Sequence, residues 1–513
     1  MNRTLRLSMR LCGAMLLWQG LAGAALAQAN WMPDPGFSVS TYAVDNIISL
    51  PSGKVLINGP FSGVNGTPTE GVALLNTDGT VDASFQAPGL LNGRSVYSLA
   101  MQPDGKVLIG GDFDQLYGAS PRNRIARLNV DGTLDATFDP GTGANDEVLR
   151  LALQSDGKVL IGGRFTEVGG VARNRIARLN ANGTLDATFD PGTGTNGTPW
   201  HLALQPDGKV LIGGAFTEVN GVARNRIARL NANGTLDATF DPGTGTNGTP
   251  WHLALQPDGK VLIGGSFTEV NGVARNRIAR LNANGTLDAA FNPGTGTNGA
   301  PLHLALQPDG KVLIGGEFTE VDGVARNRIA RLNANGTLDT TFNPGAGADY
   351  IVNSVSVQPD GKVLIGGWFT QVGGEAHPRI ARLMPAFTIG GTITGLTGAG
   401  LVLRNNGSGD LAVPAPAPAG PAPFVFAMPV APGGAYDVTV LAQPAGQLCA
   451  VTANGQGNAA ADVANVQIDC VVAPVAPGGP QAIPVDAPWA LGLLAAALGV
   501  LGGHRKLRVN QKR

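Results

Sequence analysis

The chain has 513 residues, of which 43% are hydrophobic and 14% are charged, and its formal net charge is −1. A chain of this length can form several domains with large cores. The near-zero net charge excludes the global basic field that attracts nucleic acid or an anionic membrane surface, so we expect no nucleic acid among the partners.

Residues 1–27 have the pattern of an export signal. Three arginines precede an apolar run that ends in the small-residue site Ala25-Leu26-Ala27. Secretory signals share this order of charge, apolar segment and cleavage site. We expect the export machinery to bind this segment and cleavage to follow Ala27. A buried first helix is the alternative interpretation of the same run.

Residues 31–385 form a tandem repeat of about 51 residues. In one repeat, residues 202–204 and 210–212 are predicted to form a hairpin around a Pro-Asp-Gly turn, and residues 227–230 and 236–240 a second one around Asn-Gly. Four strands per repeat at this period predict an all-β fold with a seven-bladed β-propeller. The lysine of the repeated phrase Gly-Lys-Val-Leu-Ile marks the seven units at Lys54, Lys106, Lys158, Lys209, Lys260, Lys311 and Lys362.

The seventh repeat ends at Leu383 without the Asp-x-x-Phe sequence found in the other six. The mature N-terminus supplies a candidate replacement, because residues 31–36 resemble residues 189–192 at the end of an internal repeat. We expect this N-terminal strand to dock on the last blade, close the ring and cover an open sheet edge. An open solenoid is the alternative, but it would require polar capping repeats, which the sequence does not show.

The repeated phrases resemble a known family. Gln-Pro-Asp-Gly-Lys-Val-Leu-Ile-Gly-Gly followed by Arg-x-Asn-x-x-Gly-Thr-Leu-Asp-x-x-Phe is similar to the delta-60 repeats of bacterial exported proteins, and the resemblance covers all seven units. It implies a propeller-like fold at the cell exterior. It implies no activity for any named residue.

Residues 386–472 lack the lysine phrase and contain strand-like stretches, which predict a small β-sandwich. This segment is similar to the Ig-like modules of bacterial surface proteins. Once the signal is removed, Cys449 and Cys470 are the remaining cysteines, and an even pair in an exported chain predicts one disulfide. A linker rich in proline, glycine and alanine follows over residues 473–482.

Residues 483–513 combine an apolar stretch with a basic end. Residues 487–503 are 17 in number, at the short limit for a membrane-spanning helix, and basic residues follow them. With Ile483, Pro484 and Trp489 the segment resembles the IPTL-type sorting signal, which implies recognition and removal by an exosortase-like peptidase. A permanent one-span anchor is the alternative. Either way we expect the folded part outside the inner membrane, at the cell surface or extracellular.

Three groups of propeller residues are candidates for binding. His201, His252 and His303 occupy one position in successive repeats and could hold a transition metal or form a solvated rim. Trp200 and Trp251 could stack on a sugar or pack between blades. The position after the Gly-Gly pair varies freely, which fits either a specificity ring or unconstrained surface, and its members include Asp112, Arg164, Glu317 and Trp368.

We expect a non-enzymatic scaffold that binds an unknown glycan or protein ligand and needs no cofactor. The sequence contains no GxSxG, HExxH or Walker phrase. Repeats 199–249 and 250–300 differ at four of 51 positions, whereas a catalytic site needs different residues in distinct roles. An enzyme with its active site at the channel mouth is the first alternative, since fold alone does not decide activity. A metal- or glycan-binding propeller is the second.

Overall fold

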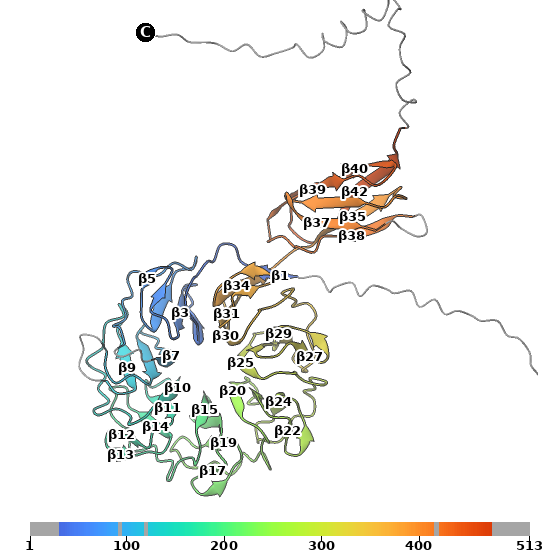
Figure 1. Ribbon diagram of the computed structural model, residues 1–513. Coiled ribbons are helices and arrows are strands. Elements are labelled where there is room, and N and C mark those ends of the chain that lie inside the picture. Colours follow the sequence, from blue (N-terminus) through green and yellow to red (C-terminus); the bar gives the residue numbers. More distant parts are fainter. Residues whose placement is uncertain (1–29, 91–94, 117–121, 415–419, 475–513) are drawn as a thin grey trace, which may run out of the picture. The chain divides into compact units, whose positions relative to one another are not determined.

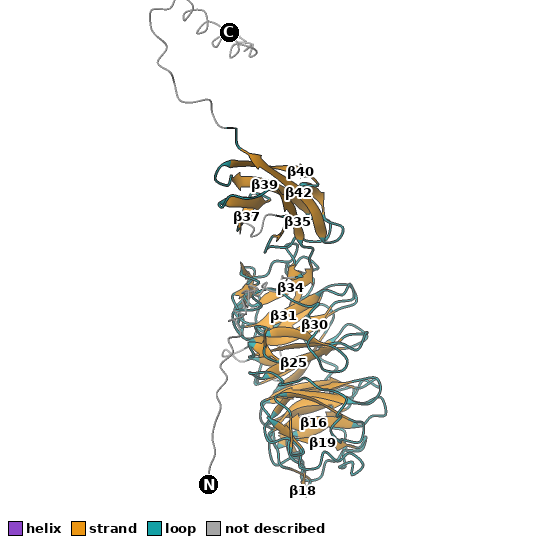
Figure 2. Ribbon diagram, turned by 90° about the vertical axis from the view of Figure 1, so that its right-hand side faces the viewer, coloured by secondary structure: helices purple, strands orange, loops and turns teal. Residues whose placement is uncertain are grey.

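The computed structural model describes residues 30–90, 95–116, 122–414 and 420–474 (Figures 1 and 2). Every regular element in these residues is a β-strand, and none of the described residues forms a helix long and apolar enough to cross a membrane. The predicted signal segment with its cleavage site after Ala27 and the sorting tail with Ile483, Pro484 and Trp489 lie outside the described residues. The chain divides into two compact units.

The propeller repeats one three-stranded antiparallel sheet around a ring (Figure 1). Its main strands in the first four blades are β2 (Asn46–Ser49), β3 (Val55–Asn58) and β6 (Val72–Leu75); β7 (Val96–Met101), β8 (Val107–Gly111) and β9 (Ile125–Leu128); β10 (Val148–Leu153), β11 (Val159–Gly163) and β14 (Ile176–Leu179); β15 (Pro199–Leu204), β16 (Val210–Gly214) and β19 (Ile227–Leu230). Those in the last three blades are β20 (Pro250–Leu255), β21 (Val261–Gly265) and β24 (Ile278–Leu281); β25 (Pro301–Leu306), β26 (Val312–Gly316) and β29 (Ile329–Leu332); β30 (Val352–Val357), β31 (Val363–Gly367) and β34 (Ile380–Pro385).

Short two-stranded hairpins connect the second and third main strands. They are β4 (Gly63–Val64) with β5 (Thr67–Pro68), β12 (Glu167–Val168) with β13 (Val171–Ala172), β17 (Glu218–Val219) with β18 (Val222–Ala223), β22 (Glu269–Val270) with β23 (Val273–Ala274), β27 (Glu320–Val321) with β28 (Val324–Ala325), and β32 (Gln371–Val372) with β33 (Glu375–Ala376). The seven-bladed all-β fold predicted from the repeat is therefore confirmed.

The predicted fourth strand is wrong for the first six repeats, because that segment forms a turn. Leu236 makes a single β-bridge with Leu230 and the pairing stops there. The Asp237 carboxylate then accepts hydrogen bonds from the backbone N–H and the hydroxyl of Thr239, at 2.9 and 2.7 Å. Such side-chain bonds to the local backbone favour a turn over a strand. The turn carries Phe240 into the core, where it is fully buried.

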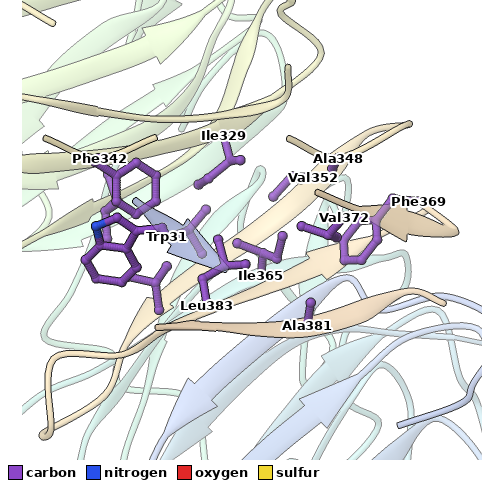
Figure 3. Packing of buried hydrophobic residues seen from close by; sticks show 13 residues of the cluster. Trp31, Ile329, Phe342, Ala348, Val352, Ile365, Phe369, Val372, Ala381 and Leu383 are labelled. Atoms are coloured by element: carbon purple, nitrogen blue, oxygen red, sulfur yellow. The ribbon is translucent and has the colours of Figure 1, made fainter. Parts of the chain in front are cut away.

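The N-terminus closes the ring, as predicted. Strand β1 (Trp31–Pro33) pairs antiparallel with β34 and adds a fourth strand to the last blade. Trp31 is buried and its ring lies 4.8 Å from that of Phe342 (Figure 3). Because chain ends close the last blade, the alternative of an open solenoid is wrong.

The alignment that predicted closure was displaced by four residues. It placed Asp34 on Asp190, but Asp34 corresponds to Asp186, so residues 34–37 are the seventh Asp-x-x-Phe sequence. The Asp34 N–H donates to the Arg382 carbonyl, and the Arg382 guanidinium lies 4.7 Å from the centre of the Phe37 ring. The internal blade has the same two contacts, at 2.8 Å for the hydrogen bond and 5.0 Å for the ring.

An ion-pair lattice joins the blades. The Asp237 carboxylate accepts hydrogen bonds from Lys209 Nζ at 2.9 Å and from Arg229 Nε at 2.7 Å. Arg229 Nη1 also donates to the Ala283 carbonyl of the next blade at 2.7 Å. The Lys–Asp pair occurs in all seven blades, which explains why the lysine and the Asp-x-x-Phe sequence recur together. The first blade has Leu74 in place of the arginine.

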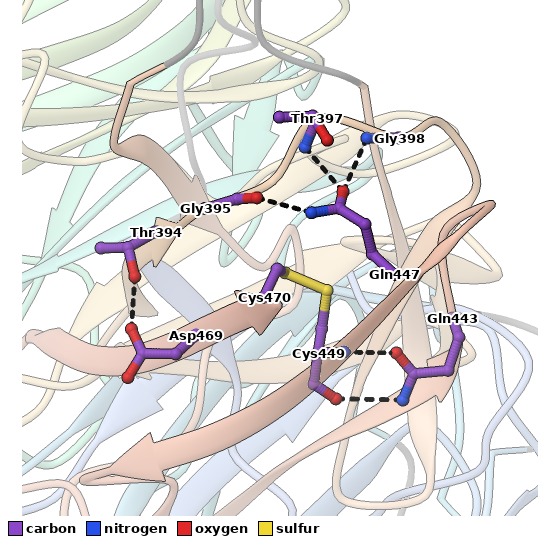
Figure 4. Close-up of a disulfide and its surroundings, with 9 residues drawn as sticks. All are labelled: Thr394, Gly395, Thr397, Gly398, Gln443, Gln447, Cys449, Asp469 and Cys470. Carbon is purple, nitrogen blue, oxygen red and sulfur yellow. Dashed lines mark hydrogen bonds between the residues drawn. A yellow bond between two sulfur atoms is a disulfide. The ribbon is translucent and has the colours of Figure 1, made fainter. Parts of the chain in front are cut away.

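The second unit contains two four-stranded sheets, in the orders β38-β35-β42-β40 and β37-β36-β39-β41. Cys449 and Cys470 face each other across β40 and β42 and form the predicted disulfide (Figure 4). The Gln443 side chain makes two hydrogen bonds to the backbone of Cys449: it accepts from the Cys449 N–H and donates to the Cys449 carbonyl. The strands are β35 (Ile389–Thr394), β36 (Leu401–Asn405), β37 (Ser408–Val413), β38 (Ala422–Val425), β39 (Ala435–Ala442), β40 (Gln447–Ala453), β41 (Gln456–Asn458) and β42 (Val463–Val472).

Candidate functional site

A β-bulge interrupts the innermost strand of six blades, near its start. In β15, Pro199 pairs with Gly214 and His201 with Gly213, so Trp200 has no residue opposite it. A bulge of this kind bends the strand and re-aims a side chain. Since the sequence placed the start of this strand at residue 202, it missed the bulge. The six bulged residues are Tyr97, Leu149, Trp200, Trp251, Leu302 and Asn353.

The bulged side chains line one pocket of 370 Å³ near the start of the innermost strands. Figure 1 shows these strands around the centre of the ring. The first blade has no bulge in β2 and contributes Asp45 and Asn46 instead. Glu147, Arg150 and Arg164 complete the lining. The volume falls in the range of small-molecule sites, which is about 300–1,000 Å³.

Two indoles form part of the pocket wall. The rings of Trp200 and Trp251 lie 5.3 Å apart at an interplanar angle of 58°, and both side chains are half-buried. The Arg164 guanidinium lies 5.6 Å from the centre of the Trp200 ring and pairs with Glu147 at 3.1 Å. The two indoles therefore pack against each other across blades, as expected, and also line the pocket. Stacking on a sugar stays a prediction.

The opposite part of the lining is polar. Asn353 Nδ2 donates to Asp45 Oδ1 at 3.2 Å. Burial raises the pKa of Asp45 to about 6, although the charge of Arg150 and the hydrogen bond from Asn353 act in the opposite direction. Arg150 Nη1 donates to the carbonyls of Tyr97 and Leu149, at 3.2 and 3.0 Å. Asp45 and Arg150 thus place opposite charges in the same partly enclosed space.

The three histidines lie one residue further along the same strands. Ring centroids are 4.0 Å apart between His201 and His252, and 4.1 Å apart between His252 and His303. Burial, with the charge of Arg150, lowers the pKa of His303 to about 3 and holds those of the other two well below the usual value. In the part of the chain that the structure describes, no group of three or more His, Cys, Asp or Glu side chains is placed to hold a metal ion. The histidines form a row of neighbouring rings tilted at 48° to one another, and they are not among the residues that line the pocket.

The remaining candidates lie outside the pocket lining, except Arg164, and Asp112 contacts a lining residue. Asp112 accepts a hydrogen bond from the Tyr97 hydroxyl at 3.3 Å, and burial together with this carboxylate raises the pKa of Tyr97 to about 12. Glu317 is exposed. Trp368 contacts Tyr42 edge-on, with ring centroids 5.6 Å apart. Neither Glu317 nor Trp368 lines the pocket.

A second variable position in the repeat supplies most of this pocket. The residue before each histidine or its equivalent takes five identities in seven blades, and this column supplies seven pocket residues. The varying position after Gly-Gly supplies a single lining residue, Arg164. Both columns vary in the sequence, so the bulge, which is visible in the structure alone, is what distinguishes Leu302 and Asn353 as pocket residues, and Asp45 lies at the aligned position of the first blade.

Comparison with known proteins agrees with this architecture. A family model described as "Domain of unknown function (DUF5122) beta-propeller" matches seven segments, residues 50–85, 102–138, 154–189, 205–240, 256–291, 307–342 and 358–386. The chain is a seven-repeat β-propeller protein. The family description names no activity for the propeller, and no curated protein matches the chain.

Solved structures resemble the propeller only distantly. PorZ, a bacterial surface component of the type-IX secretion system of Porphyromonas gingivalis, is 12% identical over 80% of this chain and 58% of its own, with a TM-score of 0.41. YCF48 bound to D1 peptide is 13% identical over 69% and 94%, with a TM-score of 0.39. A gluconolactonase from Xanthomonas campestris is 14% identical over 70% and 98%, with a TM-score of 0.33. Similarity at this level assigns no function to the propeller.

Proposed function

We propose that the protein is an exported, surface-associated scaffold that binds a glycan or protein ligand in the channel-mouth pocket without chemical turnover. The observation that carries this proposal is the pocket lining: one aligned position supplies a side chain from each of the seven blades, and these side chains are of five kinds, Asp, Tyr, Leu, Trp and Asn. Two successive repeats, 199–249 and 250–300, differ at four of 51 positions and both carry Trp at the pocket position. The asymmetry of the pocket therefore comes from the other blades, which contribute Asp45, Tyr97, Leu149, Leu302 and Asn353.

The chemistry of the lining supports ligand binding. Half-exposed indoles such as Trp200 and Trp251 offer large apolar area that a ligand can cover. Asp45, Arg150 and Asn353 converge on the same space and can fix a ligand's orientation. A mostly apolar cavity with a few placed polar groups is the usual composition of a binding site.

Export is supported by independent features of the chain. The Cys449–Cys470 disulfide is stable in oxidising compartments outside the cytoplasm. Residues 1–27 have the order of a signal peptide, and the resemblance of residues 483–513 to a sorting signal implies membrane passage and processing by an exosortase-like peptidase. Fractionation of cells that produce the full chain, or the chain without residues 483–513, tests this part: we expect retention at the surface in the first case and release in the second. Cytoplasmic recovery of both would refute export.

Binding is tested with arrays of glycans and of bacterial surface peptides. Full-length protein in mild detergent is compared with the double variant Trp200→Ala/Trp251→Ala. We expect specific binding by the wild type and its loss in the double variant. Binding that survives in the double variant would show that the pocket is not the site.

One observation favours an enzyme at the same pocket as a second candidate function. A carboxyl whose pKa is raised to about 6 by burial, as in Asp45, suits general acid or base chemistry near neutral pH. Saturable turnover of a bound ligand that is abolished in Asp45→Asn, with binding retained, would establish the enzyme in place of the scaffold.

A further inference from the structure

We propose that the pocket binds a neutral sugar ring, either a free monosaccharide or the terminal unit of a glycan. This inference rests on the proposed binding function and assigns the chemical class of the ligand. It follows from the order of side chains around the mouth, the pairing of charges in the lining and the placement of the lining residues around one opening.

The mouth has an apolar arc and a polar arc. The fourth to sixth blades contribute Trp200, Trp251 and Leu302, and the third blade adds Leu149 beside the charged Glu147, Arg150 and Arg164. The seventh, first and second blades contribute Asn353, Asp45 and Tyr97. A ligand that fits both arcs has an apolar face on one side and polar groups along another edge. A pyranose ring has this form, with C–H bonds on one face and hydroxyl groups at its edge.

The charges of the lining are balanced, which disfavours an ionic ligand. Arg164 pairs with Glu147 at 3.1 Å, and the positive charge of Arg150 acts on Asp45 in the same pocket. An anionic ligand would meet two carboxylates, and a cationic ligand would meet two guanidinium groups. Since a charge that enters a partly desolvated site without its own partner is costly, the lining favours a neutral ligand.

The polar arc can bind hydroxyl groups. The Asp45 carboxylate has about four acceptor positions in its two oxygens, and one of them accepts from Asn353 Nδ2 at 3.2 Å. A side-chain amide both donates and accepts. Adjacent acceptors and donors of this kind match neighbouring hydroxyl groups, each of which both donates and accepts.

The arrangement of the lining explains why the end of a glycan is expected. The lining residues come from all seven blades around one opening. We therefore expect a chain to insert its terminal unit.

The experiment titrates full-length protein with glucose, galactose and mannose, with the charged relatives glucosamine and glucuronate, and with oligosaccharides that end in each hexose. Isothermal titration calorimetry measures the affinities. We expect at least one neutral hexose to bind, and its charged relatives to bind at least about tenfold more weakly. The free hexoses and the oligosaccharides distinguish the two sources of the sugar ring.

Three variants locate the binding. Trp200→Ala and Trp251→Ala should each weaken the affinity by about tenfold or more, as expected for an aromatic residue central to a contact. Trp368→Ala is the matched control, because Trp368 contacts Tyr42 and lies outside the lining. Tighter binding of a charged relative, or an unchanged affinity in Trp200→Ala, would overturn the proposal. If no sugar binds while an array peptide still requires both tryptophans, the sugar class is wrong and the binding function stands.

Discussion

Replacing Asp34 with alanine should weaken the closure of the propeller. Its carboxylate accepts hydrogen bonds from Lys362 Nζ at 2.9 Å and from Arg382 Nε at 2.8 Å, which join the N-terminus to the last repeat. It also accepts from the N–H of Gly36 at 2.9 Å and stabilises its own turn. The side chains of Asp34 and Arg382 are only 8% and 9% exposed, so water replaces these interactions poorly.

The expected loss follows from burial. Removing one partner of a buried ion pair leaves an uncompensated charge and costs about 3–5 kcal/mol. Lys362 has a second carboxylate partner, Asp360, at 3.6 Å, whose side chain is 56% exposed. An exposed pair contributes about 0–1 kcal/mol. Asp360→Ala is therefore a control that removes a charge from the same lysine but leaves the closure intact.

Guanidinium unfolding and hydrogen exchange measure the effect. We expect a lower unfolding midpoint for Asp34→Ala, with faster exchange in β1 and β34, and a midpoint near the wild-type value for Asp360→Ala. If the two variants are equally stable, or if exchange in β1 is unchanged, Asp34 does not hold the ring closed.

Three further changes test other parts of the structure. Burial alone would raise the pKa of Asp237, but hydrogen bonds from its Thr, Lys and Arg neighbours outweigh burial and hold the pKa far below the usual range. The stability that this carboxylate contributes is present above its unfolded-state pKa of about 3.9 and should fall as the pH drops below that value. An equal unfolding midpoint at pH 6 and pH 3 would contradict this. Reducing the Cys449–Cys470 disulfide should destabilise the second unit by about 3 kcal/mol, because it frees a loop with a sequence separation of 21. Hydrogen exchange measured by mass spectrometry should be faster in this unit and unchanged in the propeller. Gly214→Ala would place a Cβ 2.2 Å from the Thr198 carbonyl oxygen. Calorimetry should therefore show a lower melting temperature. An unchanged melting temperature would mean that the backbone relaxes to make room for the Cβ.

Features with a repeated local cause could be predicted from the sequence. The blade hairpin follows from a Val-Leu-Ile strand beside an Asp-Gly turn, and Gly208 does have the positive φ, 81°, that this turn requires. Closure followed from counting the repeats. The disulfide followed from an even pair of cysteines, and Cys449 and Cys470 are directly opposite in the sheet.

Features that depend on competition between interactions could not be predicted. Residues 236–240 have the composition of a strand, but Asp237 bonds its own turn and an ion pair, and these outweigh further pairing. The pocket was missed for a related reason. A bulge adds one residue to a strand without changing its composition, so nothing in the order Pro-Trp-His-Leu shows that Trp200 points into the channel mouth.

The same architecture separates stability from recognition. The contacts that hold each blade, such as the Lys209–Asp237–Arg229 arrangement, involve side chains that the repeats share, whereas the bulged residues have no cross-strand partner in the sheet. A bulged side chain can therefore differ between blades without disturbing the ladder on either side of it. Related blades thus form the ring, while the bulged position of six of them takes four different side chains, Tyr, Leu, Trp and Asn, at the mouth. Because the shared contacts stabilise each blade, the bulged position can vary, and this position is where we expect ligand recognition.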